Sequence, residues 1–169
     1  GSVFSFDLKQ TVVVEDTIGD YEKRIRSSAE KQYTYNETFT APDAHVMIVD
    51  DNKVNRKVFT ALLKMAQIQI TEADSGYKAI ELAASQNFDL IFMDHMMPGM
   101  DGIEAMERIK AMKEGFCANT PIIVLTANAV AGSKEKYFED GFDGYLSKPI
   151  EPEKLFKIIM DMLPEGKIR

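Results

Sequence analysis

The chain has 169 residues, with 20 Lys and Arg, 27 Asp and Glu, and a formal net charge of −7. Apolar residues make up 45% and charged residues 28%, which are the proportions of a globular chain with enough apolar material for a full core. This composition excludes a disordered tail, a collagenous repeat and a disulfide-rich mini-protein. No apolar run approaches the roughly 20 residues that cross a bilayer, so we expect no membrane helix and no signal peptide.

The charge balance and the cysteine content narrow the class of protein further. An acidic chain is a poor candidate for nucleic-acid binding, which needs clustered Lys and Arg. The single Cys117 cannot form an internal disulfide, which fits a reducing, cytoplasmic environment. One Cys and two isolated His cannot complete a zinc site. We therefore expect a cytoplasmic segment with no nucleic-acid partner and no membrane contact of its own.

Residues 1–42 lack the regular alternation of apolar runs that the rest of the chain has. The stretches 3–8 and 11–14 favour two short strands because β-branched and aromatic residues dominate them. Residues 20–40 are polar and predict a linker with one short helix over 21–31. Two short strands without a third partner are marginally stable alone, so this segment looks like a piece of a larger sheet.

From Ala44 onward, short apolar runs recur and predict five strands. Three of them are uninterrupted, as expected of strands that are buried on both faces of a parallel sheet. The predicted strands are 46–49, 68–73, 90–93, 122–125 and 145–146.

Between and after these runs, apolar residues recur at helical spacing and predict five helices. Asp101 opens the third helix, the fourth lies within 129–140, and Gly141 stands just past its end. Five βα units in about 120 residues predict an α/β fold, a parallel sheet covered by helices on both faces. The apolar residues that mark the other helices are Val54, Val58, Leu62 and Met65; Ala79, Leu82 and Ala83; Ile103, Met106 and Ile109; and Leu155, Ile158, Ile159 and Met162.

Polar residues follow the predicted strands at the points where they end. In an open parallel sheet, ligands bind outside these carboxyl ends, so the residues there are the candidates for chemistry. Three carboxylates brought to one edge repel each other, and a hard cation is the usual remedy. The residues that follow the strands are Asp50 and Asp51, Asp94, Thr126, and Ser147, Lys148 and Pro149.

Four segments contain these residues: Val49-Asp50-Asp51-Asn52, Met93-Asp94-His95-Met96-Met97-Pro98-Gly99-Met100-Asp101-Gly102, Leu125-Thr126-Ala127-Asn128-Ala129 and Tyr145-Leu146-Ser147-Lys148-Pro149-Ile150. In order and spacing they resemble the receiver domain of two-component response regulators. The resemblance covers roughly residues 43–165. It implies the flavodoxin-like, doubly wound five-stranded parallel sheet of that family, with strand order 2-1-3-4-5.

The resemblance also implies a reaction, the transfer of a phosphoryl group from a phosphohistidine donor, in a histidine kinase or a phosphotransfer domain, to the carboxylate of Asp94. Positioning and charge neutralisation supply most of the catalysis in such transfers, and the receiver catalyses its own phosphorylation and dephosphorylation. The site would hold Mg²⁺, which takes few protein ligands and keeps several waters. The implied metal ligands are Asp94, Asp51, Asp50 directly or through water, and the backbone carbonyl of Met96.

The remaining implied roles concern phosphoryl binding and a surface switch. Lys148 would pair with Asp94 at rest and with a phosphoryl oxygen after transfer, while Thr126 and the backbone N–H of Ala127 would bind another oxygen. When Thr126 moves to the phosphoryl group, Tyr145 would turn inward and change the adjoining surface. The peptide bond before Pro149 is expected to be cis, which would aim Lys148 at the site.

The N-terminal stretch Gly1-Ser2-Val3-Phe4-Ser5-Phe6-Asp7-Leu8 resembles the end of the ATP-binding domain of a sensor histidine kinase. Hybrid histidine kinases place this domain ahead of a receiver, although Gly1-Ser2 is equally compatible with a cloning remnant. The sequence has no phosphoacceptor-histidine helix motif and no Gly-rich ATP lid, so the fragment itself is not a kinase. The expected organisation is a kinase strand remnant (1–18), a linker (19–42), the receiver (43–165) and a tail (166–169), from a parent that could be membrane-anchored.

Residues 1–14 are also expected to form an intermolecular contact. Their apolar strands would belong to a kinase sheet in the parent, and unpaired strands of this kind seek partners. The sequence therefore predicts a homodimer through residues 1–14.

Three other functions stay open at this point. A metal-dependent aspartyl phosphatase would need Asp-x-Asp after the first strand, whereas Asp50 and Asp51 are adjacent and the candidate nucleophile follows the third strand. A pseudo-receiver that binds partners without phosphate would lack an acid or the Lys. A transcription factor would need a DNA-binding domain after the last helix.

Several other residues have plain structural interpretations. His95 is expected to be an exposed loop residue and His45 to open the first strand. Cys117 is expected to be unreactive. The ten methionines are expected mainly at helical core positions, where they fill gaps.

Overall fold

The computed structural model describes residues 39–112, 115–127 and 133–169 of the chain. The predicted strands at 3–8 and 11–14, the predicted helix at 21–31 and the predicted dimer contact through 1–14 lie outside these described residues.

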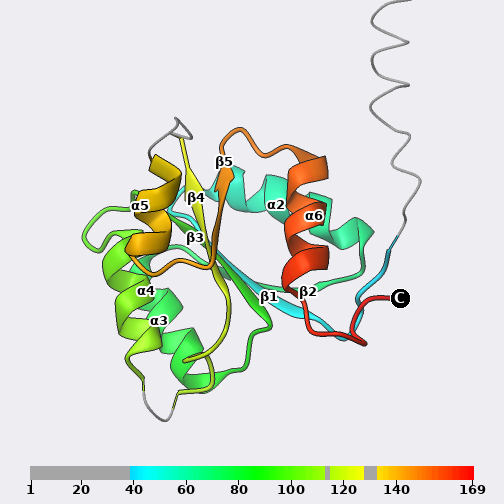
Figure 1. The fold of residues 1–169 in the computed structure, drawn as a ribbon, viewed down its shortest axis with the longest axis horizontal. Coiled ribbons are helices and arrows are strands. Elements are labelled where there is room, and N and C mark those ends of the chain that lie inside the picture. Colours follow the sequence, from blue (N-terminus) through cyan, green and yellow to red (C-terminus); the bar gives the residue numbers. More distant parts are fainter. Residues whose placement is uncertain (1–38, 113–114, 128–132) are drawn as a thin grey trace, which may run out of the picture. The chain divides into compact units, whose positions relative to one another are not determined.

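Within the described residues, five strands form one parallel sheet with the order β2-β1-β3-β4-β5 (Figure 1). This order and the parallel pairing confirm the predicted flavodoxin-like fold. The strands are β1 (His45–Val49), β2 (Gln69–Ala73), β3 (Leu90–Asp94), β4 (Ile122–Thr126) and β5 (Gly144–Ser147).

Helices cover both faces of this sheet (Figure 1). Buried residues of α2 and α6 belong to one hydrophobic cluster, and buried residues of α3, α4 and α5 belong to the other. The helices are α2 (Lys53–Met65), α3 (Gly76–Ser85), α4 (Gly102–Lys110), α5 (Ser133–Glu139) and α6 (Pro152–Met162). None of these helices is long and apolar enough to cross a membrane.

The strand residues alternate between the two clusters, as the two-residue period of a strand requires. In β3, Leu90 and Phe92 face the α2 and α6 side, whereas Ile91 and Met93 face the other side. All five residues of β3 and of β4 are buried. A strand with both faces covered is therefore apolar throughout, which is why these runs could be recognised in the sequence.

The strand register brings the carboxyl ends of neighbouring strands to one edge of the sheet. Val49 pairs with Met93, so the residues that follow β1 lie beside the end of β3. Thr126 pairs with Ser147, so Lys148 follows β5 next to the end of β4. The parallel topology thus gathers residues from four separate parts of the sequence.

Most of the apolar residues that marked α2 in the sequence are exposed. Val54, Val58 and Met65 are exposed by 66%, 47% and 70%, whereas Phe59 and Leu63 are buried. Two apolar stripes at helical spacing exist in this segment, and spacing alone does not say which one turns inward. The predicted helix is confirmed, but of the four residues that marked it only Leu62 packs partly against the core.

The expectation for the methionines is also wrong. Met47 and Met93 are fully buried, but both lie in strands of the sheet. Met96, in the loop after β3, is 78% exposed. Only a minority of the methionines lie in helices, because several belong to the strands and to the loop before α4.

The described unit extends beyond the predicted limits of 43–165. Ala41 is fully buried, and its N–H donates to the carbonyl of Ala66. Thr40 and Arg169 exchange two backbone hydrogen bonds of 2.9 and 2.8 Å, so the two ends of the described chain lie side by side. Phe39 packs edge-on against Phe156. Part of the predicted linker and the predicted tail thus contribute to the domain.

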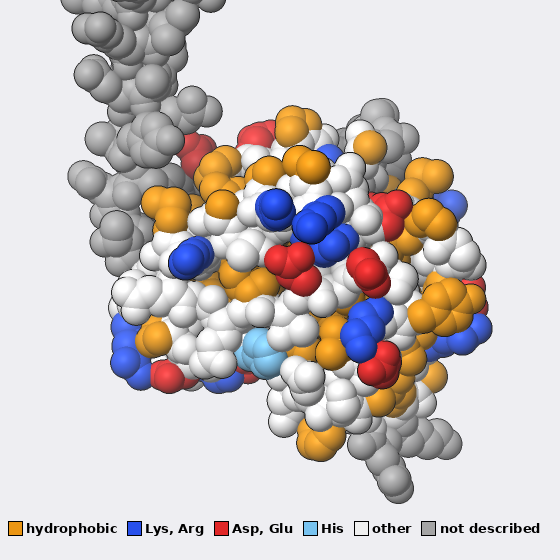
Figure 2. Space-filling view, turned by 180° about the vertical axis from the view of Figure 1, so that it is seen from behind, with side chains coloured by type: hydrophobic (Ala, Val, Ile, Leu, Met, Phe, Trp, Pro, Cys, Tyr) orange, Lys and Arg blue, Asp and Glu red, His pale blue; other side chains and the backbone are white. Residues whose placement is uncertain are grey.

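The surface carries mixed charge. Figure 2 shows one face on which basic and acidic side chains lie close together, with hydrophobic side chains between them. Several of the surface ion pairs join residues that are one turn apart on the same helix, such as Lys78 with Glu81 and Arg108 with Glu104. Exposed pairs of this kind add little stability, so the fold depends on its two apolar clusters.

A chain that begins at Asp43 should be less stable than one that begins at Glu37. The shorter chain loses the burial of Ala41, the ring contact of Phe39 and the backbone bonds to Ala66 and Arg169. We expect both to fold, with an unfolding free energy lower by roughly 2 kcal/mol in the shorter chain. Thermal unfolding followed by circular dichroism measures this difference, and equal melting temperatures would contradict the packing role of residues 39–41.

Candidate functional site

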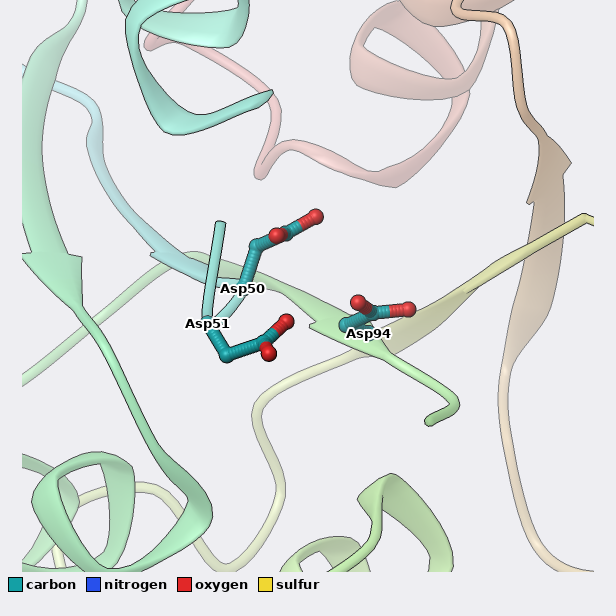
Figure 3. Close-up of side chains that lie close together, drawn as sticks. All are labelled: Asp50, Asp51 and Asp94. Atoms are coloured by element: carbon teal, nitrogen blue, oxygen red, sulfur yellow. The ribbon is translucent and has the colours of Figure 1, made fainter. Parts of the chain in front are cut away.

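Three carboxylates meet where β1 and β3 end. Asp50 and Asp51 follow β1, and Asp94 is the last residue of β3. Each offers an oxygen within 4.8 Å of the others, and Figure 3 shows the three side chains gathered at the strand ends. Asp50 and Asp94 are only 1% and 7% exposed, whereas Asp51 is open to solvent. The predicted clustering of these residues is therefore present in the structure.

Lys148 bridges the two buried carboxylates. Its Nζ lies 2.8 Å from Oδ2 of Asp50 and 2.8 Å from Oδ2 of Asp94. The peptide bond between Lys148 and Pro149 is cis, as the resemblance implied. The pairing with Asp94 was expected from the sequence, but the equally short pairing with Asp50 was not.

The surroundings shift the pKa of two of these groups. Burial raises the pKa of the Asp94 carboxyl above its ordinary value, and the charge of Asp50 adds to this rise. The hydrogen bond and charge of Lys148, and a backbone hydrogen bond from Met96, oppose the rise without cancelling it. Burial alone would lower the pKa of Lys148, but its bonds to Asp50 and Asp94 raise it overall. The ammonium group therefore stays charged at neutral pH.

Both oxygens of Asp50 already accept hydrogen bonds. Oδ1 accepts from the backbone N–H of Asn52 at 2.8 Å and from the Asn55 amide at 3.1 Å. Oδ2 accepts from the same amide at 3.0 Å and from Lys148. The carboxylate is thus fixed by donors on every side, while Asp51 keeps an exposed side chain.

Asn55 was not singled out in the sequence. It lies in the first turn of α2, which the side chain of Asn52 caps by accepting a 2.8 Å bond from the N–H of Val54. This cap fixes where the helix starts and turns Asn55 toward Asp50. An amide five residues after the first Asp, in the first turn of a helix, is the sequence feature that could have indicated it.

Arg56 was missed as well. Its Nη1 donates to the carbonyls of Asp50 and Asp51 at 2.6 and 3.3 Å, and its Nε pairs with Glu72 at 3.0 Å. Arg56 therefore ties the loop after β1 to the neighbouring strand β2 and holds the backbone of both acidic residues.

Gly102 allows α4 to start close to the site. A Cβ at this position would lie 2.2 Å from the backbone oxygen of Asp94, so any larger residue would push the helix away. The side chain of Asp101 caps this helix by accepting from the N–H of Glu104 at 2.8 Å. The close approach fixes the backbone around Asp94.

The predicted phosphoryl-binding residues surround a cavity of about 360 Å³ that also contains Asp94. Thr126, Ala127 and Lys148 all line it. Tyr137 of α5 also lines it, and its hydroxyl lies 2.8 Å from Oγ1 of Thr126. Tyr137 was missed because nothing in the sequence separates it from an ordinary core aromatic.

Tyr145 and His95 were also singled out in the sequence. Tyr145 of β5 is partly buried, and its ring meets the edge of Phe138 with the centroids 6.5 Å apart. His95 is half-buried with its ring against Tyr137, so the expectation of an exposed loop histidine is wrong.

His45 does open β1, as predicted. Cys117 is buried, and its Sγ donates to the carbonyl of Gln86.

The donor set at this site fits a hard divalent cation. Three carboxylates and one ammonium leave two negative charges without compensation. Carboxylate and carbonyl oxygens are the ligands that Mg²⁺ prefers, and it needs only a few of them. Asp51 and Asp94 are the carboxylates best able to bind such an ion, because the oxygens of Asp50 already serve Asn52, Asn55 and Lys148.

A sequence model described as the response regulator receiver domain matches residues 46–160. The chain belongs to this family. The histidine-protein kinase BarA of Escherichia coli K12 is 44% identical over 123 residues, which cover 73% of this chain and 13% of BarA. This receiver chain therefore spans only a small part of the curated relatives that it matches.

Solved structures of receivers have the same fold. The receiver domain of sensor histidine kinase PA1611 from Pseudomonas aeruginosa, with a magnesium ion coordinated in its active-site cleft, has a TM-score of 0.64 and 34% identity, and covers 70% of this chain and 96% of that one. The receiver of Saccharomyces cerevisiae Ssk1, in complex with the histidine phosphotransfer protein Ypd1, has a TM-score of 0.63 and 28% identity, and covers 73% and 94%.

The raised pKa of Asp94 leads to a prediction about the receiver without metal. Because the folded state raises this pKa above 3.8, the ionised carboxylate costs stability at every pH above the raised value, and this cost disappears below 3.8. Asp94→Asn should therefore raise the melting temperature at pH 7 in the presence of a chelator, and the gain should shrink as the pH falls toward 4.

Thermal unfolding at several pH values measures this gain. Asp161→Asn, an exposed acid on α6, is the matched control and should change the melting temperature little at any pH. A lower melting temperature for Asp94→Asn at pH 7 would contradict the conclusion that the buried, ionised carboxylate of Asp94 lowers the stability of the fold.

Proposed function

We propose that this receiver takes a phosphoryl group from a phosphohistidine onto Asp94 and uses Mg²⁺ to do so. The single observation that supports this most strongly is the bridge of Lys148 between Asp50 and Asp94 beside a third carboxylate. Folding alone does not need two buried like charges at the ends of strands. They lower the stability of the fold unless a bound ligand offsets this cost.

In the proposed reaction, an oxygen of Asp94 attacks phosphorus while the phosphorus–nitrogen bond of the donor breaks. The electron pair of that bond returns to the donor imidazole, and an acyl phosphate forms on Asp94. A bound Mg²⁺ would neutralise the charge on the phosphoryl oxygens. Asp51, Asp94 and the carbonyl of Met96 would hold the ion directly, and Asp50 would bind one of its waters.

Lys148 would change one partner and keep the other. At rest it pairs with Asp50 and Asp94 at the same distance of 2.8 Å. Once Asp94 is phosphorylated, Lys148 would move its second bond to a phosphoryl oxygen and retain Asp50. Asp50 therefore serves as a fixed anchor, since Asn52 and Asn55 already hold its carboxylate.

The hydroxyl of Thr126 and the N–H of Ala127 would bind another phosphoryl oxygen. Both line the cavity next to Asp94. Turning of Tyr145 after Thr126 moves would then alter the surface formed by α5, β5 and α6. This switch is supported by the contact between Tyr145 and Phe138, which links the strand to α5.

The proposed donor is a domain that carries a phosphohistidine, in a histidine kinase or a phosphotransfer protein. Exposed apolar side chains beside the acidic cluster support a protein partner there: Val54 and Val58 on α2, and Met96 in the loop after β3, are exposed by 66%, 47% and 78%. We further propose that this receiver forms part of a hybrid histidine kinase and works on the cytoplasmic side, and the similarity to the histidine-protein kinase BarA supports the first of these.

Acetyl phosphate with Mg²⁺ should add one phosphoryl group to the chain, on Asp94. Intact-mass spectrometry counts the groups, and borohydride reduction followed by peptide mapping locates the acyl phosphate. Asp94→Asn should lose the modification, whereas His95→Gln, which alters the neighbouring side chain, should keep it.

Three results would contradict the proposal. Modification of Asp94→Asn at the wild-type level would assign the phosphoryl group to another residue. An unmodified wild-type chain would favour a receiver that binds partners without phosphate. Rapid release of phosphate from added monoesters would instead favour an aspartyl phosphatase.

Mg²⁺ should raise the melting temperature of the wild-type chain, because it binds only the folded cluster. At a Mg²⁺ concentration about 100 times its Kd, the stabilisation is about 2.7 kcal/mol. Asp51→Asn should lose most of this effect, while Asp161→Asn should retain it. If Asp51→Asn binds Mg²⁺ as tightly as the wild-type chain in a thermal-shift titration, Asp51 is not a ligand.

A further inference from the structure

The hydroxyls of Thr126 and Tyr137 form a hydrogen bond of 2.8 Å beside the site. Thr126 is the last residue of β4 and is 2% exposed, and Tyr137 lies on α5 and is 6% exposed. This bond connects a residue of the proposed phosphoryl site directly to a helix on the neighbouring surface.

Packing on two sides holds the ring of Tyr137 in place. The ring of His95 meets it edge-on with the centroids 5.5 Å apart, and the ring of Phe142 meets it edge-on at 6.4 Å. His95 follows Asp94 in the chain, so the ring rests on the loop that carries the phosphoacceptor. The hydroxyl end of Tyr137 therefore points into the cavity that Asp94, Lys148 and Thr126 also line.

We propose that Tyr137 is a positioning residue that holds the Thr126 hydroxyl in its resting orientation, so that a phosphoryl group on Asp94 must compete with Tyr137 for it. This inference rests on the proposed function. When Thr126 turns to a phosphoryl oxygen, its bond to Tyr137 breaks. The Tyr137 hydroxyl is then left buried without this partner, which is costly for a polar group.

The competition links the site to the surface through α5. Relief of the unpaired hydroxyl requires a shift of α5, because the Tyr137 ring is fixed between His95 and Phe142. The next residue, Phe138, is 53% exposed and meets Tyr145 edge-on. A shift of α5 therefore moves an exposed aromatic side chain together with the environment of Tyr145.

The test is a titration of the full chain with beryllium fluoride, a phosphoryl analogue, at saturating Mg²⁺, followed by amide NMR shifts. Tyr137→Phe keeps the ring and removes only the hydroxyl, so it should bind the analogue about three- to tenfold more tightly than wild type. Tyr77→Phe is the matched control, since Tyr77 on α3 is 60% exposed, and it should bind like the wild type.

The same change in a Thr126→Val background separates the hydrogen bond from general packing. Without the Thr126 hydroxyl there is nothing for Tyr137 to hold, so Tyr137→Phe should no longer tighten binding. Equal or weaker binding by Tyr137→Phe in the wild-type background would overturn the inference, and so would an equal gain in the Thr126→Val background. Both results leave the proposed function intact, whereas a wild-type chain whose Asp94 takes no analogue would overturn the two together.

Discussion

Lys148 holds two carboxylates that are almost completely buried, at 2.8 Å from each. The ammonium offsets the repulsion between these two acidic side chains, and a buried ion pair that loses one partner costs several kcal/mol. The ammonium compensates only part of the negative charge of the cluster, because Asp51 adds a third carboxylate. The cluster therefore keeps a net negative charge at the edge of the sheet, which favours a cation there.

The rest of the structure serves to hold this arrangement. The parallel sheet brings the ends of β1, β3, β4 and β5 to one edge, which places acidic, hydroxyl and ammonium groups together. Arg56 fixes the loop that carries Asp50 and Asp51, and the missing side chain of Gly102 lets α4 pack against the backbone of Asp94. Rigid elements therefore position every group in the cluster, as a site that works by positioning and charge requires.

Much of the fold and part of the site could be predicted from the sequence. Buried parallel strands such as β3 and β4 are apolar throughout, so their runs mark the sheet directly, and the residues after them mark its functional edge. The rotation of α2 could not be predicted from spacing alone. The stripe of Asn55, Phe59 and Leu63 turns inward because Phe59 and Leu63 are buried, and Phe59 packs against Phe92 of β3, a residue far away in the sequence. Tyr137 was missed for a similar reason, because its role depends on a hydroxyl partner on another element.

The structure of the chain with Mg²⁺ and beryllium fluoride tests the central role of Lys148 most directly. We expect the analogue on an oxygen of Asp94, with Lys148 Nζ within hydrogen-bond distance of a fluorine and still bonded to Asp50. Lys148 still paired with Asp94, or the analogue bound at another residue, would contradict it.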